Sequence, residues 1–263
     1  MSNYGFIGCG NMGGALIRAA VKSVEPSNVW ITDKDAAKRA AMAKETGAQP
    51  KEILELASRC QYIFIGVKPQ GLAAMLSEIQ GTLAERKDHF VLVSMVAGTS
   101  IERLVSMVGD YPLIRIMPNI PASVGEGMIL YCSYKADNAD VQGFLSAMDK
   151  AGRLTEIEEK LIDAGSAVSG CGPAYAFMFI EALADGGVRC GLPRKQAQLL
   201  AAQTLLGSAK MVMESGKHPG ELKDAVCSPG GTTIEGVLAL EQGSFRGTVS
   251  DAVIAAYEKT KGL

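Results

Sequence analysis

The sequence has few of the residues that carry metal, disulfide or nucleic-acid chemistry. Its two histidines, His89 and His218, stand apart from each other and show no metal-ligand spacing with the six cysteines. The cysteines form no CxxC pair, which predicts free, mostly buried thiols in a reducing compartment. The net charge is -2, with no basic stripe and no interleaved aromatic residues. We therefore expect no metal site and no nucleic-acid partner.

The sequence also shows no long apolar run and no pattern typical of a targeting segment. No apolar run reaches membrane-spanning length, so we expect no membrane partner. An apolar strand begins at Tyr4, which leaves no room for a basic stretch, an apolar segment and a cleavage site. Cytoplasmic is the expected location. A length of 263 residues with 48% hydrophobic and 21% charged residues suits a soluble protein of one large or two small domains.

Residues 1–152 alternate short apolar strands with helical stretches. The expected strands are NYGFIG, NVWITD, QYIFIGV, HFVLVSMVAG, YPLIRIMPN and GMILYCS. Continuous apolar strands separated by helices predict a parallel sheet that is buried on both faces, with right-handed crossovers. The fold class is therefore α/β, with a doubly wound, Rossmann-type first domain.

Residues 153–263 carry only helical patterns, so we expect an all-α second domain. Two of its helices, at 174–184 and 199–213, are apolar nearly all round. A helix of that kind is buried on every side, and a domain of this size offers little cover of its own. The pattern therefore favours a homo-oligomer in which a second subunit covers Phe177–Leu183 and Leu199–Met213. A compact monomeric bundle is the alternative.

The segment FIGCGNMGG predicts a dinucleotide site. Gly8, Gly10 and Gly13 follow a strand and open a helix, and Asp33 stands twenty positions after Gly13, at the end of the second strand. The glycines allow a tight turn, close approach of a pyrophosphate and packing of the helix on the strand. A glycine-rich turn without a ligand is the alternative reading.

The choice of dinucleotide stays open. Asp33 would accept a hydrogen bond from a ribose 2′-hydroxyl, which favours NAD(H). Lys34, Lys38 and Arg39 follow at once, and they either pair with the 2′-phosphate of NADP(H) or form a solvated helix face. Lys68 closes a later strand and is either a ligand of cofactor phosphate or substrate, or a surface lysine.

The segment CSPGGTTIEG, residues 227–236, predicts a helix entrance that holds a small anion. Gly230 and Gly231 permit backbone geometries in which consecutive N–H groups converge on a carboxylate. No GK[ST] is present, so a phosphate-binding P-loop is excluded. The alternative is an ordinary helix start that Thr232 or Thr233 caps.

Several segments together resemble pyrroline-5-carboxylate reductase along essentially the whole chain. They are FIGCGNMGGALI, VKPQ, RIMPNIPA, VSGCGPAYAFMFIEALADGGV, HPGELKDAVCSPGGTTIEG and FRGTVSDAV. The resemblance implies NAD(P)H-dependent reduction of Δ1-pyrroline-5-carboxylate, a cyclic imino acid, to L-proline, the last step of proline synthesis. It also implies a helical C-terminal domain that interlocks with its partner in a homodimer, with pentamers of dimers in some members.

The resemblance also assigns site residues. It places in the cofactor site Gly8, Cys9, Gly10, Asn11, Met12, Gly13, Thr32, Asp33, Lys34, Val67, Lys68, Pro69, Gln70, Met95, Val96 and Ala97. It places in the substrate site Glu159, Ser228, Gly230, Gly231, Thr232 and Thr233. We expect Thr233 to hydrogen-bond the ring nitrogen, and Glu159 either to favour a cationic iminium or to be an exposed residue of the acidic run EIEEK. Relatives that prefer NADP(H) usually carry a small polar residue where Asp33 stands, which leaves cofactor preference open.

Two other functions compete with this reading. A related dehydrogenase of small acids, such as a 3-hydroxyacid dehydrogenase, or another imine reductase would share the dinucleotide domain. The dehydrogenase would need a catalytic lysine that SGCGPAYAFMFIEAL does not offer. A non-catalytic dinucleotide-binding regulator would not need a carboxylate-shaped helix entrance. Neither His89 nor His218 looks like a buried general acid, which agrees with chemistry that needs orientation more than acid catalysis.

Overall fold

The computed structural model describes residues 3–260, which form two compact units. The first unit runs to Cys171 and includes the chain again from Tyr257, and the second is Gly172–Ala256. The domain boundary that we expected at residues 152 and 153 lies upstream of this division, because residues 153–171 still pack with the first unit.

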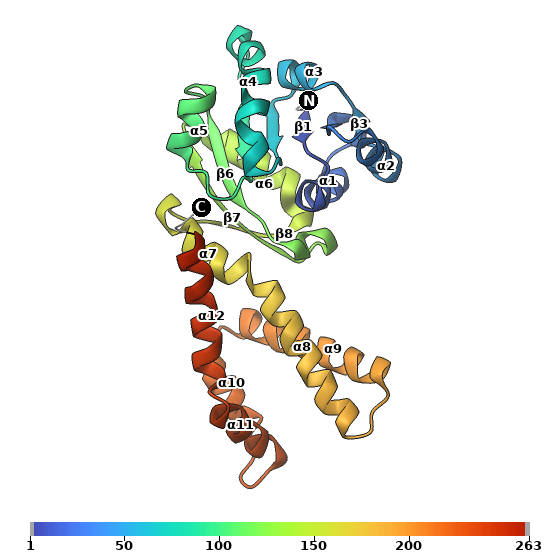
Figure 1. Ribbon diagram of the computed structural model, residues 1–263, viewed down its shortest axis with the longest axis vertical. Coiled ribbons are helices and arrows are strands. Elements are labelled where there is room, and N and C mark those ends of the chain that lie inside the picture. Colours follow the sequence, from blue (N-terminus) through green and yellow to red (C-terminus); the bar gives the residue numbers. More distant parts are fainter. Residues whose placement is uncertain (1–2, 261–263) are drawn as a thin grey trace. The chain divides into compact units, whose positions relative to one another are not determined.

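The first unit is built on one sheet of eight strands within the described residues (Figure 1). These are β1 (Tyr4–Ile7), β2 (Val29–Thr32), β3 (Gln49–Pro50), β4 (Tyr62–Ile65), β5 (Val91–Ser94), β6 (Leu113–Met117), β7 (Gly127–Tyr134) and β8 (Gly152–Glu156). Their order is β3-β2-β1-β4-β5-β6-β7-β8. The order reverses direction between β1 and β4, and such a switch point opens a crevice at the carboxyl ends of the strands.

Helices cover both faces of the sheet, as the doubly wound prediction requires. They are α1 (Asn11–Ser23), α2 (Ala36–Thr46), α3 (Ile53–Arg59), α4 (Pro69–Glu85), α5 (Ile101–Val108), α6 (Asn138–Met148) and α7 (Ile162–Ser169), with short 3₁₀ turns at Pro26–Asn28, Ile120–Val124, Asp149–Ala151 and Glu159–Leu161. One core cluster joins the sheet to α1 and α6 through Leu16 and Phe144. A second joins it to α3, α4 and α5 through Leu56, Met75 and Leu104. The sheet is therefore buried on both sides.

The expectation of a wholly parallel sheet is wrong at one pairing. β1 to β6 are parallel, but β7 runs antiparallel to β6. Only a short 3₁₀ turn joins Met117 to Gly127, and a parallel return needs a crossover of a dozen or more residues. The sequence pattern also missed the two edge strands, β3 and β8. β3 has two residues, and β8 (GRLTE) is largely exposed and so lacks an apolar run.

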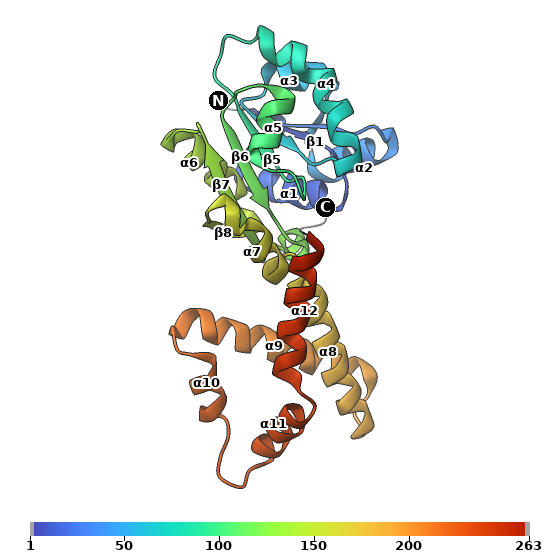
Figure 2. The same cartoon turned by 60° about the vertical axis from the view of Figure 1, so that its left-hand side comes forward.

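The second unit is helical, as predicted (Figure 2). Its helices are α8 (Gly172–Arg189), α9 (Arg194–Ser215), α10 (Pro219–Ala225), α11 (Thr232–Gln242) and α12 (Phe245–Thr260), the last of which ends in the first unit. Pro219 opens α10. Proline suits the first helical position because its missing N–H has no partner there anyway.

The second unit buries almost none of its apolar side chains. Its buried cluster consists of Ala184, Ala197 and Ala201, with Ile180 and Val188 packed against it. By contrast, Phe177 is 57% exposed and Met178 is 68% exposed. A core of three alanines removes little apolar area from water, so the unit needs further cover to be stable.

The stretch that contains α7 and α8 is long and apolar. By length and composition alone, Glu159–Arg189 is long and apolar enough to cross a membrane. An 18-residue window within it has a mean hydropathy of 1.3, and 11% of that window is buried. Within this stretch α7 ends at Ser169 and α8 begins at Gly172, and Gly170 between them has right-handed helical angles (φ −75°, ψ −45°). A single run of this kind is weak evidence for a membrane and agrees equally well with a helix that packs on a partner.

Candidate functional site

The glycine-rich turn between β1 and α1 has the geometry that its sequence predicts. Gly8 has φ +112°, and a Cβ at this position would lie 2.5 Å from the carbonyl oxygen of Gly66. A Cβ on Gly13 would lie 2.1 Å from the carbonyl oxygen of Gly8, so any larger residue would push α1 away from β1. Gly10 faces open space. The turn thus needs two glycines for packing and leaves the third position free for a ligand to approach.

The start of α1 offers hydrogen-bond donors to an anion. Gly10 is the N-cap residue, and no side chain caps the helix. The first N–H groups of a helix lack intrahelical acceptors, and the helix dipole adds partial positive charge at this end. Cys9, Asn11 and Met12, which we predicted as cofactor residues, belong to this turn or to the first turn of α1. The donor set suits a phosphate or pyrophosphate.

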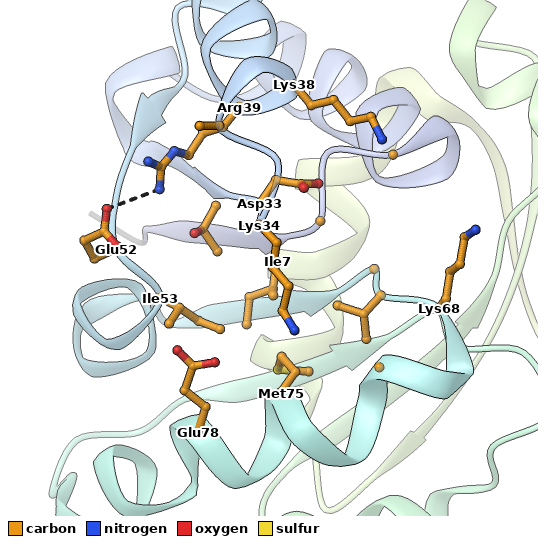
Figure 3. A pocket seen from close by; sticks show the side chains of 17 residues that line it. Ile7, Asp33, Lys34, Lys38, Arg39, Glu52, Ile53, Lys68, Met75 and Glu78 are labelled. Carbon is orange, nitrogen blue, oxygen red and sulfur yellow. Dashed lines mark hydrogen bonds and ion pairs between the residues drawn. The ribbon is translucent and has the colours of Figure 1, made fainter.

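A pocket of about 610 Å³ lies at the carboxyl ends of β1, β2 and β4 (Figure 3). Seven predicted cofactor residues line it: Gly8, Gly10, Thr32, Asp33, Lys34, Val67 and Lys68. Predicted residues outside this lining are Cys9, Asn11, Met12, Gly13, Pro69, Gln70, Met95, Val96 and Ala97. Of these, Pro69 and Gln70 open α4, and Met95, Val96 and Ala97 follow β5, the neighbour of β4 in the sheet.

Asp33 is held in place by backbone N–H groups. The N–H of Cys9 donates to Asp33 Oδ2 at 2.6 Å, and the N–H of Asp35 donates to Oδ1 at 2.8 Å. The carboxylate therefore ties the glycine-rich turn to the end of β2. An ionised carboxylate has about four acceptor sites, so Asp33 can still accept a ribose hydroxyl.

The basic residues of the pocket differ in their partners. Arg39 Nη1 donates to Glu52 Oε1 at 3.2 Å, and Lys38 Nζ lies 3.6 Å from Asp35 Oδ2. Lys34 extends into the pocket (Figure 3) and has no ion-pair partner among residues 3–260. Three cations thus stand close to the ribose position of Asp33, and two of them are already paired.

Sequence reasoning missed part of the pocket wall. Glu52, Ile53, Met75 and Glu78 line it from α3 and α4 or just before them, with Gly66 and Gly71. Figure 3 shows Glu52, Ile53 and Glu78 at one end of the pocket and Lys68 at the other. These residues belong to no sequence motif. Only their position could have predicted them, because each belongs to an element that follows or flanks a strand at the switch point.

The substrate motif lies in the second unit, where a tight turn leads into α11. The N–H of Gly231 donates to the carbonyl of Ser228 at 3.0 Å across Pro229 and Gly230, and Gly230 has φ +65°. Proline followed by a residue of positive φ is the pattern of a type II turn. This explains why the sequence needs Gly230.

The threonines of this motif do not cap the helix, so the capping alternative is wrong. Gly231 is the N-cap residue of α11, and no side chain accepts from the first-turn N–H groups. Thr232 and Thr233 are the first two helical residues, and both are exposed. The entrance therefore presents uncapped N–H groups beside two hydroxyls, which is a donor set for a carboxylate.

Glu159 lies in the first unit and is engaged by protein groups. Its Oε1 accepts from the N–H of Ile101 at 2.6 Å and from Arg115 Nη1 at 3.0 Å. Arg115 is 4% exposed, and its Nη2 donates to Asp163 Oδ1 at 3.3 Å. Glu159 therefore joins its 3₁₀ turn to α5 and β6, and it is not the exposed glutamate that the acidic run suggested.

The two histidines have hydrogen-bond partners within the protein, and the thiol of Cys9 is buried. His89 Nε2 lies 2.8 Å and 2.9 Å from the carboxylate oxygens of Asp140, and His218 Nδ1 accepts from the N–H of Gly220 at the start of α10. Burial, with a smaller contribution from Asp33, raises the pKa of the Cys9 thiol to about 11, so the thiol beside the glycine turn is protonated at neutral pH. No group of three His, Cys, Asp or Glu side chains within residues 3–260 is placed to hold a metal ion.

Comparison with known proteins finds two families, one in each half of the chain. Residues 3–98 match the family "NADP oxidoreductase coenzyme F420-dependent", and residues 159–263 match "Pyrroline-5-carboxylate reductase dimerisation". The structure is similar to the pyrroline carboxylate reductase of Plasmodium falciparum with NADP bound, with a TM-score of 0.86 and 36% identity over 99% of this chain and 97% of the other. It also matches a pyrroline-5-carboxylate reductase from Coxiella burnetii, with a TM-score of 0.90 and 28% identity over 99% and 98% of the two chains.

Sequence relatives agree along the full length. The pyrroline-5-carboxylate reductase of Escherichia coli (strain K12) is 43% identical over 98% of this chain and 97% of its own. That of Glycine max is 40% identical over 98% and 95%. The chain therefore belongs to the pyrroline-5-carboxylate reductase family.

Proposed function

We propose that this chain reduces Δ1-pyrroline-5-carboxylate to L-proline with NADPH or NADH as the reductant. The observation that carries the proposal is the uncapped start of α1 at the sheet's switch point, in a chain 43% identical over 98% of its length to a named pyrroline-5-carboxylate reductase. Two-electron reduction of a C=N bond needs a reductant, and the pocket is built for a dinucleotide.

The residues present fit that cofactor. Gly8 and Gly13 leave room that a Cβ would fill, and the first turn of α1 offers free donors to the pyrophosphate. Asp33 orients the adenosine ribose at the end of β2. When bound, the reduced nicotinamide supplies the hydride. The NADP in the Plasmodium falciparum relative supports use of the phosphorylated form.

We propose that the substrate carboxylate binds at the entrance of α11. The uncapped N–H groups after Gly231 hold the carboxylate, and the type II turn fixes their direction. Thr233 Oγ accepts a hydrogen bond from the protonated ring nitrogen, which orients the C=N bond. A protonated imine is already electrophilic, so these residues act by orientation and charge complementarity and no strong side-chain acid is needed.

We propose a structural role for Glu159. Its Oε1 already accepts two hydrogen bonds, one of them from a buried arginine, and both would have to be disturbed for a substrate to take over that oxygen. Burying Arg115 without an opposite charge would be costly. Glu159 is therefore a brace of the first unit.

The active form that we propose is a homodimer. The second unit buries three alanines and exposes Phe177, Met178 and Leu199, and its family model is named for dimerisation. Covering these faces with the same unit of a second chain supplies the missing core. Light scattering at working concentration checks this, and an active, well-behaved monomer would contradict it.

Replacement of Thr233 with valine tests the substrate site. Valine keeps the shape and removes the hydroxyl, and the loss of a hydrogen bond to a charged group costs about 1.5–3 kcal/mol. We expect kcat/KM for the imine to fall roughly ten- to hundredfold. The melting temperature should stay within about 1 °C, because the hydroxyl caps nothing.

The same measurements on Thr232→Val compare the two hydroxyls of the entrance, since this neighbour is exposed on the same turn. Activity is followed by the absorbance of NAD(P)H, and dinucleotide affinity by fluorescence. An unchanged kcat/KM in Thr233→Val would remove Thr233 from the reaction. A wild-type chain that binds dinucleotide without reducing the imine would instead favour a regulator.

A further inference from the structure

The end of the pocket near Asp33 is lined by both acidic and basic side chains. Arg39 Nη1 donates to Glu52 Oε1 at 3.2 Å, and Lys38 Nζ lies 3.6 Å from Asp35 Oδ2. Asp33 occupies the position at the end of β2 from which this fold reads the adenosine ribose. The neighbouring cations are therefore the groups that a ribose 2′-phosphate would meet.

The start of α2 is closed to a second anion. Asp35 is its N-cap residue, and its Oδ1 accepts from the N–H groups of Ala37 at 3.0 Å and Lys38 at 3.2 Å. These backbone hydrogen bonds, led by that of Lys38, hold the pKa of Asp35 below its ordinary value, so the cap is a carboxylate at neutral pH. A 2′-phosphate must therefore be neutralised by side chains, because Asp35 already occupies two of the N–H donors of this helix terminus.

Arg39 is the side chain best suited to that task. A guanidinium binds phosphate in a bidentate geometry that an ammonium cannot match. Its side chain is 26% exposed, so it is better fixed than the neighbouring Lys38, which is 61% exposed. In the structure, however, the guanidinium is directed at Glu52 (Figure 3).

Within the described residues, the side chain of Glu52 pairs with Arg39 and caps no helix. It is the N-cap residue of α3, but its side chain makes no capping hydrogen bond. Its carboxylate is 83% exposed and lies on the pocket wall, where it pairs with Arg39. An exposed ion pair of this kind is weak, so a ligand phosphate can compete for the guanidinium.

We infer that Glu52 is a specificity-determining residue that selects against the 2′-phosphorylated dinucleotide by occupying Arg39 and by placing negative charge beside the ribose site. The inference rests on the proposed function only for the class of ligand. It names a determinant that acts together with Asp33 but lies on a different element, and it predicts that the affinity for NADPH relative to NADH can be raised without touching Asp33.

The test is the dissociation constants of NADPH and NADH for the full chain, measured by fluorescence titration at fixed ionic strength. Glu52→Gln frees Arg39, and an exposed pair of up to about 1 kcal/mol corresponds to roughly two- to fivefold tighter NADPH binding. NADH affinity should not change. Glu55→Gln is the matched control, because Glu55 lies on the same helix, pairs with Lys51 at 2.8 Å and does not line the pocket.

A double-mutant cycle identifies the route of the effect. In an Arg39→Gln background, Glu52→Gln should lose most of its gain for NADPH. An unchanged NADPH/NADH ratio in Glu52→Gln overturns the inference, as does an equal gain in Glu55→Gln, which would show a general charge effect. A wild-type chain that binds neither dinucleotide overturns the proposed function as well, whereas binding of both with an unmoved ratio overturns this inference alone.

Discussion

Replacement of Glu159 with glutamine separates a structural brace from a substrate ligand. Glutamine keeps the shape and one acceptor oxygen but removes the charge that faces Arg115 at 3.0 Å. The arginine side chain is 5% exposed and keeps Asp163, at 3.3 Å, as its other carboxylate. The substitution therefore leaves a buried guanidinium with half of its charge compensation.

The size of the effect follows from these exposures. Breaking a fully buried ion pair by removing one partner costs about 3–5 kcal/mol. Glu159 is 34% exposed, so solvent screens part of its charge, and the second carboxylate remains. We expect a loss of about 1–2 kcal/mol in the free energy of unfolding. For a chain of this size, that lowers the melting temperature by about 2–8 °C.

Thermal unfolding is followed by circular dichroism at one protein concentration, because the stability of a dimer depends on it. Steady-state kinetics with the imine accompany it, and kcat/KM per folded enzyme should stay within about twofold. Glu158→Gln is the control, since its pair with Lys160 is exposed on both sides and should contribute little. A tenfold fall in kcat/KM of Glu159→Gln at an unchanged melting temperature would refute the brace and return this glutamate to the substrate site.

Three further predictions follow from the first unit. Gly13→Ala should abolish dinucleotide binding, measured by fluorescence, because the new Cβ would lie 2.1 Å from the carbonyl oxygen of Gly8; retained affinity would contradict the packing argument. Asp33→Ser should raise the NADPH/NADH ratio of kcat/KM and also lower the melting temperature, because the carboxylate both faces the ribose and accepts two backbone N–H groups; an unmoved ratio would show that it does not read the ribose. Burial raises the pKa of Cys60 to about 12 and that of Cys132 to about 11, so both thiols should resist disulfide reagents at pH 8 and the folded state should lose stability as the pH rises above about 9; rapid labelling of either in the native protein would contradict this.

The glycine-rich turn could be predicted from sequence because its chemistry is local. Gly8 needs a positive φ, and Gly13 needs the absence of a Cβ, so neither position accepts another residue without strain. The same holds for Gly230, whose φ of +65° the turn before α11 requires. Local requirements of this kind leave a mark at fixed spacing, which is why both motifs were visible in the sequence.

Features that depend on distant partners could not be predicted. Arg39 and Glu52, or Arg115 and Glu159, become neighbours only when the sheet has formed, and a charged residue carries no local sign of its partner. The direction of β7 depends on the length of its connection to β6 more than on its own apolar pattern. The fold class was therefore accessible from periodicity, whereas the charges that tune the pocket were not.

The two edge strands of the sheet protect a protomer from aggregation before it forms a dimer. β3 is two residues long and includes Pro50, which has no N–H to offer, and β8 exposes Arg153 and Glu156. Such edges resist the addition of a strand from another chain. An open strand would accept almost any extended peptide, whereas an apolar helix face demands a surface of matching shape. A newly made protomer is therefore protected from non-specific strand addition at its sheet edges, while the apolar faces of its helical unit pair only with a surface of matching shape.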